Sequence, residues 1–145
     1  MTDSIGATPK ALQRAQIMTA LRAASSKTGV DFDYLVKTAQ RESNFDPGAK
    51  ASTSSATGLF QFTSETWLNV LERYGAKHGL KTEGLSHEEL LDLRKDASLS
   101  AAMAGELASE NGKILARKLG REATSAELYT AHFMGPSDAA RLITA

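Results

Sequence analysis

The chain has 145 residues, 41% hydrophobic and 23% charged, which is typical of a globular domain and not of a disordered or fibrous chain. Lysine plus arginine number 17, as do aspartate plus glutamate, so the net charge of zero argues against a nucleic-acid-binding protein. The absence of cysteine excludes disulfides, cysteine nucleophiles and thiolate metal sites. No apolar run reaches the ~18–20 residues that a membrane span requires.

The first half of the chain carries helix signals. Thr8 followed by Pro9 predicts a helix that begins there, and apolar residues then recur at helical spacing as far as Gly29. A second helix is predicted from about Asp31 to Ser43, because Pro47 disfavours any continuation. Residues 1–7 are small and polar and lack the features of a secretory signal, so we expect a flexible tail followed by one domain over residues 8–145.

The second half is also predicted to be helical. Residues 44–62 are rich in small and polar side chains and predict a loop. The apolar pattern over 96–119 predicts a long helix with a kink or break near Asn111, where Asn111 precedes a glycine. Further helix starts are expected at Thr63 or Ser64, Ser86 with Glu89, Thr124 with Glu127, and Ser137. No alternating strand of five or more residues occurs, so we predict an all-α domain of six or seven helices.

Glu42 is the first candidate for chemistry. Leu35 and Ala39 precede it by seven and three residues, so all three lie within about 60° of one another around a helix axis. Glu42 is therefore expected to project from the apolar stripe near the helix C-terminus. An apolar surface and the negative end of a helix dipole both favour the protonated form of a carboxyl group, as a general acid needs. A boundary residue whose carboxylate reaches water fits the same pattern.

The text that follows Glu42 favours the catalytic interpretation. It reads Arg41-Glu42-Ser43-Asn44-Phe45-Asp46-Pro47, then Ser52 to Ala56, then Gly58-Leu59-Phe60-Gln61-Phe62, then Thr66-Trp67. These spacings resemble the lytic transglycosylase SLT domain, a family of the lysozyme-like group that includes goose-type lysozyme. The resemblance runs from Glu42 to Trp67 and implies a compact lysozyme-like helical fold with a substrate groove.

The resemblance also implies roles for particular residues. Glu42 is expected to be catalytic, with Ser43 beside it, and the segment from Gly58 to Gln61 is expected to line a sugar-binding groove. Phe60 stands where many relatives carry Met and would present an apolar wall to a sugar face. A loop serine is expected to bind the N-acetyl group of muramic acid, and either Ser52 or Ser54 fits that role. Trp67 is expected in the core or at the groove wall.

The C-terminal part departs from the family pattern. Many relatives carry Ala-Tyr-Asn-Ala-Gly in a late helix, and here the equivalent text is Ala131-His132-Phe133-Met134-Gly135. Tyr129 lies one turn earlier on the same side, so either Tyr129 or His132 is expected to supply the polar contact to the sugar or to Glu42. His78 and His87 are expected in a solvated surface loop. Nothing pairs His132 with a nucleophile or with a second ligand at metal spacing. We expect no metal and no cofactor.

The implied reaction is cleavage of the β-1,4 bond between N-acetylmuramic acid and N-acetylglucosamine, with Glu42 as the single acid/base and 1,6-anhydromuramic ends as product. Two alternatives stay open. Hydrolysis of the lysozyme type would need a second carboxylate, for which Asp46 is the nearest candidate, although Pro47 favours a turn-forming role for it. A non-catalytic peptidoglycan-binding or assembly module on the same fold is the other.

The partners and location follow from the family's habits. We expect peptidoglycan glycan strands as substrate, a monomer, and no nucleic acid or membrane span. The absence of a secretory signal favours a domain of a larger exported protein, or a protein of a secretion or flagellar apparatus, working in the periplasm or cell envelope.

Overall fold

The computed structural model describes residues 8–145, so the expected tail over residues 1–7 lies outside the described residues. Within the described part there is no β-strand, and the prediction of an all-α fold with six or seven helices is confirmed. The elements in chain order are α1 (Pro9–Thr28), α2 (Phe32–Ser43), α3 (Ser64–Tyr74), η1 (Ala76–His78), α4 (His87–Asp92), η2 (Leu93–Lys95), α5 (Ala97–Leu119), α6 (Ser125–Met134) and α7 (Pro136–Thr144).

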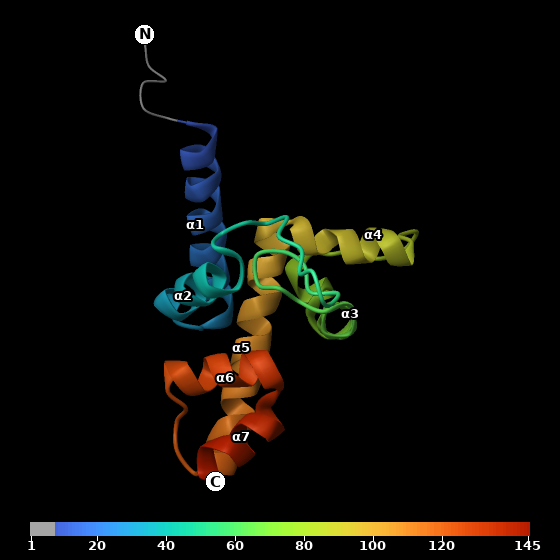
Figure 1. Ribbon diagram of the computed structural model, residues 1–145. Helices are drawn as coiled ribbons and strands as arrows, with labels where there is room; N and C mark the ends of the chain where they lie inside the picture. The colour runs from blue at the N-terminus through green and yellow to red at the C-terminus, as the bar shows by residue number, and fades with distance from the viewer. Residues whose placement is uncertain (1–7) are drawn as a thin grey trace.

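Helix α5 runs through the middle of the molecule, and the other helices are arranged around it (Figure 1). Helices α1 and α2 pack on one side of it, and α3 lies on another. The main core is made of side chains that these helices bury completely. Its largest members, all less than 2% exposed, include Ile17, Leu21, Leu35, Trp67, Val70 and Met103.

The helix ends confirm most of the boundaries expected from the sequence. The Thr8 hydroxyl accepts a hydrogen bond from the Ala11 amide, and Gly29 ends α1 in the left-handed conformation, with a φ of +78°. Both capping boxes form as expected, at the starts of α4 and α6. The last helix begins at Pro136, one residue before the predicted Ser137.

The predicted break near Asn111 is wrong, because α5 continues without interruption over 23 residues. Its alanines favour the helix, and close packing at Gly105 offsets the weak helix preference of glycine. A Cβ added at Gly105 would lie 2.7 Å from the Thr28 hydroxyl oxygen, so glycine allows α1 to approach α5 here. Asn111 is only 2% exposed and lies inside the packed helix. Tertiary packing therefore overrides the local helix-breaking signal.

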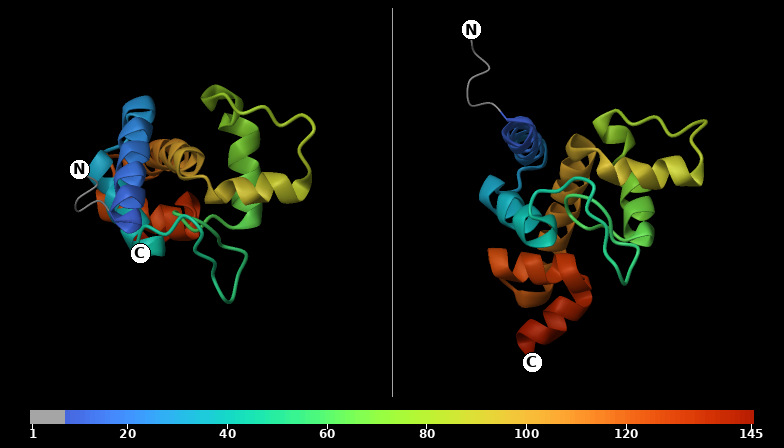
Figure 2. Two further views of the ribbon diagram at one scale, coloured as in Figure 1. Left: turned by 90° about the horizontal axis from the view of Figure 1, so that it is seen from above. Right: turned by 45° about the horizontal axis from the view of Figure 1, so that its top comes forward.

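The last two helices form a smaller packed unit on the C-terminal half of α5 (Figure 2). This unit buries Leu115 of α5 against Ala131, Ala139 and Ala140 of α6 and α7. It lies close to the C-terminal end of α2 and to the loop over residues 44–62, which crosses from α2 to α3. The fold therefore places α6 beside the C-terminal turn of α2, which carries Glu42.

Candidate active site

Glu42 lies in the last turn of α2, and its side chain is half-buried. The hydroxyl of Tyr129, on α6, donates a hydrogen bond of 2.8 Å to Glu42 Oε2. Leu35 and Ala39, which share this face of α2, are fully buried as the helical spacing predicted. The Glu42 carboxylate therefore lies at the edge of the core, on the side of α2 that faces α6.

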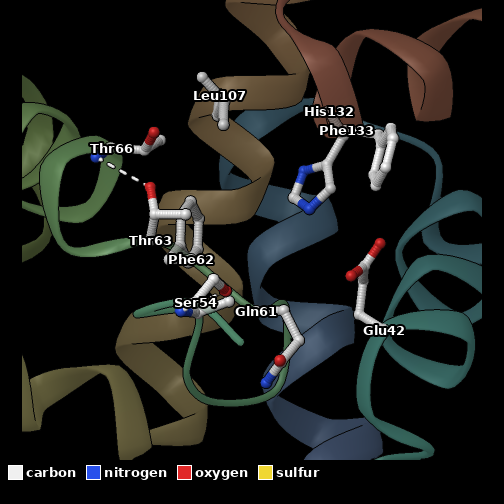
Figure 3. A pocket seen from close by; sticks show the side chains of 10 residues that line it. Glu42, Ser54, Gln61, Phe62, Thr63, Thr66, Leu107, His132 and Phe133 are labelled. Atoms are coloured by element: carbon white, nitrogen blue, oxygen red, sulfur yellow. Dashed lines mark hydrogen bonds between the residues drawn. The ribbon is translucent and has the colours of Figure 1, made fainter. Parts of the chain in front are cut away.

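A pocket of about 280 Å³ opens beside Glu42. Figure 3 shows the Glu42 carboxylate and the His132 ring turned toward the same space, with Thr63 and Leu107 on the far side. The lining residues come from α2, the loop, α3, α5 and α6, so the pocket exists only when all of these elements are assembled. Glu42 is the sole acidic group among the lining residues that the structure describes.

The segment from Gly58 to Phe62 forms one wall. Gly58 has a φ of +91°, and a Cβ at this position would lie 2.3 Å from the Arg94 carbonyl oxygen, so only glycine fits. Gln61 has a φ of +54° and lines the pocket. Its side-chain amide donates to the carbonyl oxygens of Ala49 and Gly58, at 3.1 and 2.9 Å. Gln61 thus fixes the loop, and its amide points away from Glu42 (Figure 3).

Arg94 holds the segment from Ser55 to Phe62 in place through hydrogen bonds to its backbone. It was not among the residues that the sequence singled out. Its guanidinium is buried and donates to the carbonyl oxygens of Ser55, Phe62 and Leu91, at distances of 2.6, 3.0 and 2.9 Å. Burial lowers the pKa of Arg94 from its usual value. An isolated arginine in a helical stretch gives no sequence signal for this role, because its partners are backbone carbonyls distant in the chain.

The three candidate serines have different positions. The Ser43 hydroxyl shares its single proton between the carbonyl oxygens of Leu59, at 2.8 Å, and Ala39, at 3.1 Å, and accepts from the Asp46 amide. Ser43 thereby joins α2 to the pocket wall. Ser54 lies on the pocket, and its oxygen accepts from the Ala56 amide at 3.2 Å. Ser52 is exposed and does not line this pocket. Of the two loop serines, only Ser54 lines the pocket.

The aromatic residues correct one expectation. The Phe60 side chain is completely buried and belongs to the core, so it forms no wall facing the pocket. Its neighbour Phe62, 2% exposed, lines the pocket instead. In an extended strand, Phe60 and Phe62 would point to the same side of the backbone. The positive φ at Gln61 interrupts that pattern, so only Phe62 faces the pocket. Trp67 is in the core, and its indole N–H donates to the Leu90 carbonyl oxygen.

Both C-terminal candidates reach the site. The Tyr129 and His132 rings stack with their centroids 6.4 Å apart, and the Arg41 guanidinium lies 4.9 Å from the Tyr129 ring centroid on α6. Tyr129 contacts Glu42 directly, whereas His132 lines the pocket and lies 3.2 Å, through Nε2, from the Phe60 carbonyl oxygen. Burial, followed by the hydrogen bond to the Glu42 carboxylate, raises the pKa of Tyr129, which therefore remains a donor at neutral pH.

The electrostatic state of His132 follows from its surroundings. Burial lowers the pKa of His132 from its usual value, while the Glu42 charge and the Phe60 carbonyl act in the opposite direction. A carbonyl oxygen only accepts, so Nε2 carries the proton and donates to Phe60. The neutral ring then keeps an accepting lone pair on Nδ1, for which no partner occurs among the described residues.

The remaining histidines and acids lie elsewhere. His78 is not solvated as expected, because its side chain is only 5% exposed and its Nε2 lies 2.7 Å from Glu106 Oε2. His87, the first residue of α4, is exposed as expected. Asp46 is turned away from the Glu42 pocket and accepts from the Gly48 amide at 2.9 Å, the turn-forming role predicted for it. The described residues hold no cluster of three or more potential metal ligands, and none of their helices is long and apolar enough to span a bilayer.

The helices and the half-buried carboxylate beside a groove define the chain as a lysozyme-like all-α domain. The family model for the transglycosylase SLT domain matches residues 19–118, and the chain belongs to this family. The matched range includes Glu42, the loop and Arg94, and it ends before α6. The family associates the chain with glycan-cleaving transglycosylase chemistry and with peptidoglycan as substrate.

Proposed function

We propose that this protein is a lytic transglycosylase that cleaves the β-1,4 bond between N-acetylmuramic acid and N-acetylglucosamine, with Glu42 as its only acid/base. The observation that carries the proposal is the placement of Glu42, half-buried at the edge of the pocket and hydrogen-bonded at 2.8 Å by Tyr129. Because Tyr129 occupies Oε2, the other carboxyl oxygen is left to carry the proton that reaches the substrate.

In the first step Glu42 gives its proton to the glycosidic oxygen as the bond from that oxygen to C1 of muramic acid breaks. The carbonyl oxygen of the muramic N-acetyl group bonds to C1 and stabilises the cationic centre. In the second step the C6 hydroxyl attacks C1 and displaces this carbonyl oxygen, while the Glu42 carboxylate takes the hydroxyl proton. The product is a 1,6-anhydro ring, and Glu42 returns to its protonated form without consuming water.

Among the residues that the structure describes, no second carboxylate lines the Glu42 pocket, and this supports the transglycosylase reaction over hydrolysis. Glycosidases that hydrolyse usually place two carboxyl groups about 5–9.5 Å apart on either side of the bond. Within the described residues, no acid other than Glu42 lines its pocket, and Asp46 is engaged by the Gly48 amide. A reaction in which the substrate supplies its own nucleophile therefore fits this pocket better than one in which a second carboxylate activates water.

The other lining residues have roles in binding. The Ser54 hydroxyl oxygen accepts from the Ala56 amide through a lone pair. This bond does not use the hydroxyl proton, which donates to the muramic N-acetyl group. The Nδ1 lone pair of neutral His132 accepts from a sugar hydroxyl or amide. Ser43, Gly58 and Gln61 act indirectly by holding the wall in place. Tyr129 orients the Glu42 carboxyl group.

Product analysis tests the proposal. Purified peptidoglycan is digested with the protein and with the Glu42→Gln and Glu72→Gln variants, and the fragments are identified by mass spectrometry. Glu72 is an exposed glutamate of α3 outside the pocket and serves as the matched control. Anhydro ends are expected from the wild type and from Glu72→Gln, with a loss of about 10²–10⁴-fold for Glu42→Gln. Reducing ends would indicate hydrolysis, and equal inactivity of all three proteins would indicate a non-catalytic module.

The same proposal places the protein in the bacterial cell envelope, since peptidoglycan lies there. We infer that it acts in the periplasm or as a domain of a larger exported protein, where a secretion or flagellar apparatus needs a local opening in the wall. Fractionation of cells that produce the tagged protein tests this inference. Recovery in the cytoplasm alone would contradict it.

A further inference from the structure

Arg41 and Glu42 are consecutive residues in the last turn of α2, and their side chains leave the helix in different directions. Consecutive positions differ by about 100° around a helix axis, so the two side chains do not face each other. Among the described residues, Arg41 forms no ion pair with Glu42 or with any other acid. The one contact of its guanidinium that connects it to the active site is with an aromatic ring.

That ring belongs to Tyr129 on α6. The central carbon of the Arg41 guanidinium lies 4.9 Å from the centre of the Tyr129 ring. A cation within about 6 Å of an aromatic face is attracted by the negative charge of that face, and the planar guanidinium also stacks on it. Arg41 therefore contacts the face of the same ring whose hydroxyl donates to Glu42 at 2.8 Å.

Helix α2 thus contacts the Tyr129 side chain at two points, the ring face and the hydroxyl. A single hydrogen bond to Glu42 fixes the position of the hydroxyl but leaves the ring plane free to turn. The Arg41 contact restricts that plane from α2, and the His132 ring, stacked on Tyr129 with an angle of 21° between the rings, restricts it from α6. A donor whose ring is held in one plane keeps its direction toward the Glu42 carboxylate.

We propose that Arg41 is a positioning residue of the proposed reaction and holds the Tyr129 ring in the plane that directs its hydroxyl to Glu42. The inference rests on the proposed function, because it concerns the orientation of the same acid/base. Arg41 is not among the residues that line the Glu42 pocket, so it acts through Tyr129 and not on the substrate.

The electrostatic surroundings of the Tyr129 hydroxyl agree with this arrangement. Burial, followed by the hydrogen bond to Glu42, raises the pKa of Tyr129, whereas the charge of Arg41 lowers it. The hydroxyl therefore responds to the Arg41 charge. This response can be measured without any turnover of substrate.

The Arg41→Met variant keeps the length of the side chain and removes its charge and its planar group. We expect kcat on peptidoglycan to fall by about two- to fivefold with KM unchanged, the size of an exposed contact between a cation and an aromatic ring. Arg41→Lys should recover part of kcat, because it restores the charge without the planar surface. Arg22→Met is the matched control and should leave kcat unchanged. Arg22 is an exposed arginine whose guanidinium lies 5.1 Å from the centre of the Phe32 ring, outside the pocket.

A double-mutant cycle separates positioning from an ordinary contribution to helix stability. In the Tyr129→Phe background the ring remains but the hydroxyl that reaches Glu42 is absent, so Arg41→Met should cause no further loss of kcat. A cation near a helix C-terminus also stabilises the helix through its dipole. That role alone would lower the thermal stability in both backgrounds, and Arg41→Lys would restore it fully.

NMR titration of isotope-labelled tyrosine rings gives the readout that needs no substrate. Arg41→Met should raise the pKa of Tyr129 further, and Arg22→Met should not. The inference is overturned if Arg41→Met leaves the Tyr129 midpoint or the kcat of the active enzyme unchanged, or if it lowers kcat equally in the Tyr129→Phe background. A raised Tyr129 midpoint in a protein whose wild type yields no anhydro ends would reject the proposed function and leave the contact between Arg41 and Tyr129 standing.

Discussion

Tyr129 and Glu42 are 87 residues apart in the sequence, and the Tyr129 hydroxyl donates a 2.8 Å hydrogen bond to the Glu42 carboxylate. The contact joins the C-terminal turn of α2 to α6, two helices that reach each other because both pack at α5. The Tyr129 ring also contacts the Arg41 guanidinium and stacks on the His132 ring. The orientation of the proposed catalytic group therefore depends on the packing of the C-terminal helices.

Tyr129→Phe removes this hydroxyl and keeps the ring. We expect kcat on peptidoglycan to fall by about 10–100-fold with little change in KM, since a hydrogen bond to a charged group contributes about 1.5–3 kcal/mol. Thr130→Val is the control, because the Thr130 hydroxyl bonds only to the Ala126 carbonyl of its own helix. An unchanged kcat for Tyr129→Phe would show that Glu42 is oriented without it.

The His132 imidazole is expected to titrate below its usual value of 6.5, because burial disfavours the charged ring. Glu42→Gln should lower the pKa of His132 further, since the Glu42 charge is one of the groups that raise it. NMR titration of the ring protons in both proteins measures the two midpoints. A His132 midpoint at or above 6.5 in the wild type would contradict the predicted neutral state.

The same shift predicts a dependence of stability on pH. When the folded pKa is the lower one, the unfolded chain binds more protons just below pH 6.5. The contribution of neutral His132 to stability is therefore present above pH 6.5 and is lost as the pH falls toward the folded pKa. Chemical unfolding at a series of pH values measures this loss, which should be smaller in His132→Phe than in the wild type.

Gly58→Ala is expected to destabilise the protein by more than Gly84→Ala does. Both glycines have a left-handed φ, +91° and +82°, so alanine costs about 1–2 kcal/mol at either position. At Gly58 the added Cβ would also meet the Arg94 carbonyl oxygen at 2.3 Å, whereas at Gly84 no atom lies within 4 Å. Urea unfolding compares the two variants, and equal losses of stability would mean that the Gly58 segment shifts freely away from Arg94.

The sequence by itself predicted the helical class, most helix ends and the position of Glu42 on its helix. These features depend on local physics: capping side chains, left-handed glycines and the spacing of apolar residues operate over a few neighbouring residues. The prediction failed at Asn111, where the close approach of α1 at Gly105 and the burial of α5 outweigh a weak helix preference. The prediction also failed for the Phe60 side chain, which lies in the core and not on the pocket, because the positive φ at Gln61 changes the direction of the backbone there.

The tertiary structure alone decided which partner Glu42 has. From the sequence, Tyr129 and His132 were equivalent candidates for the contact to Glu42, because both lie on the same side of one helix. That helix is separated from α2 by more than half of the chain. Packing of α6 on α5 places the Tyr129 hydroxyl on the carboxylate and turns His132 toward the Phe60 carbonyl and the pocket. Contacts between distant segments are set by how helices pack in three dimensions, and no local pattern in the sequence encodes them.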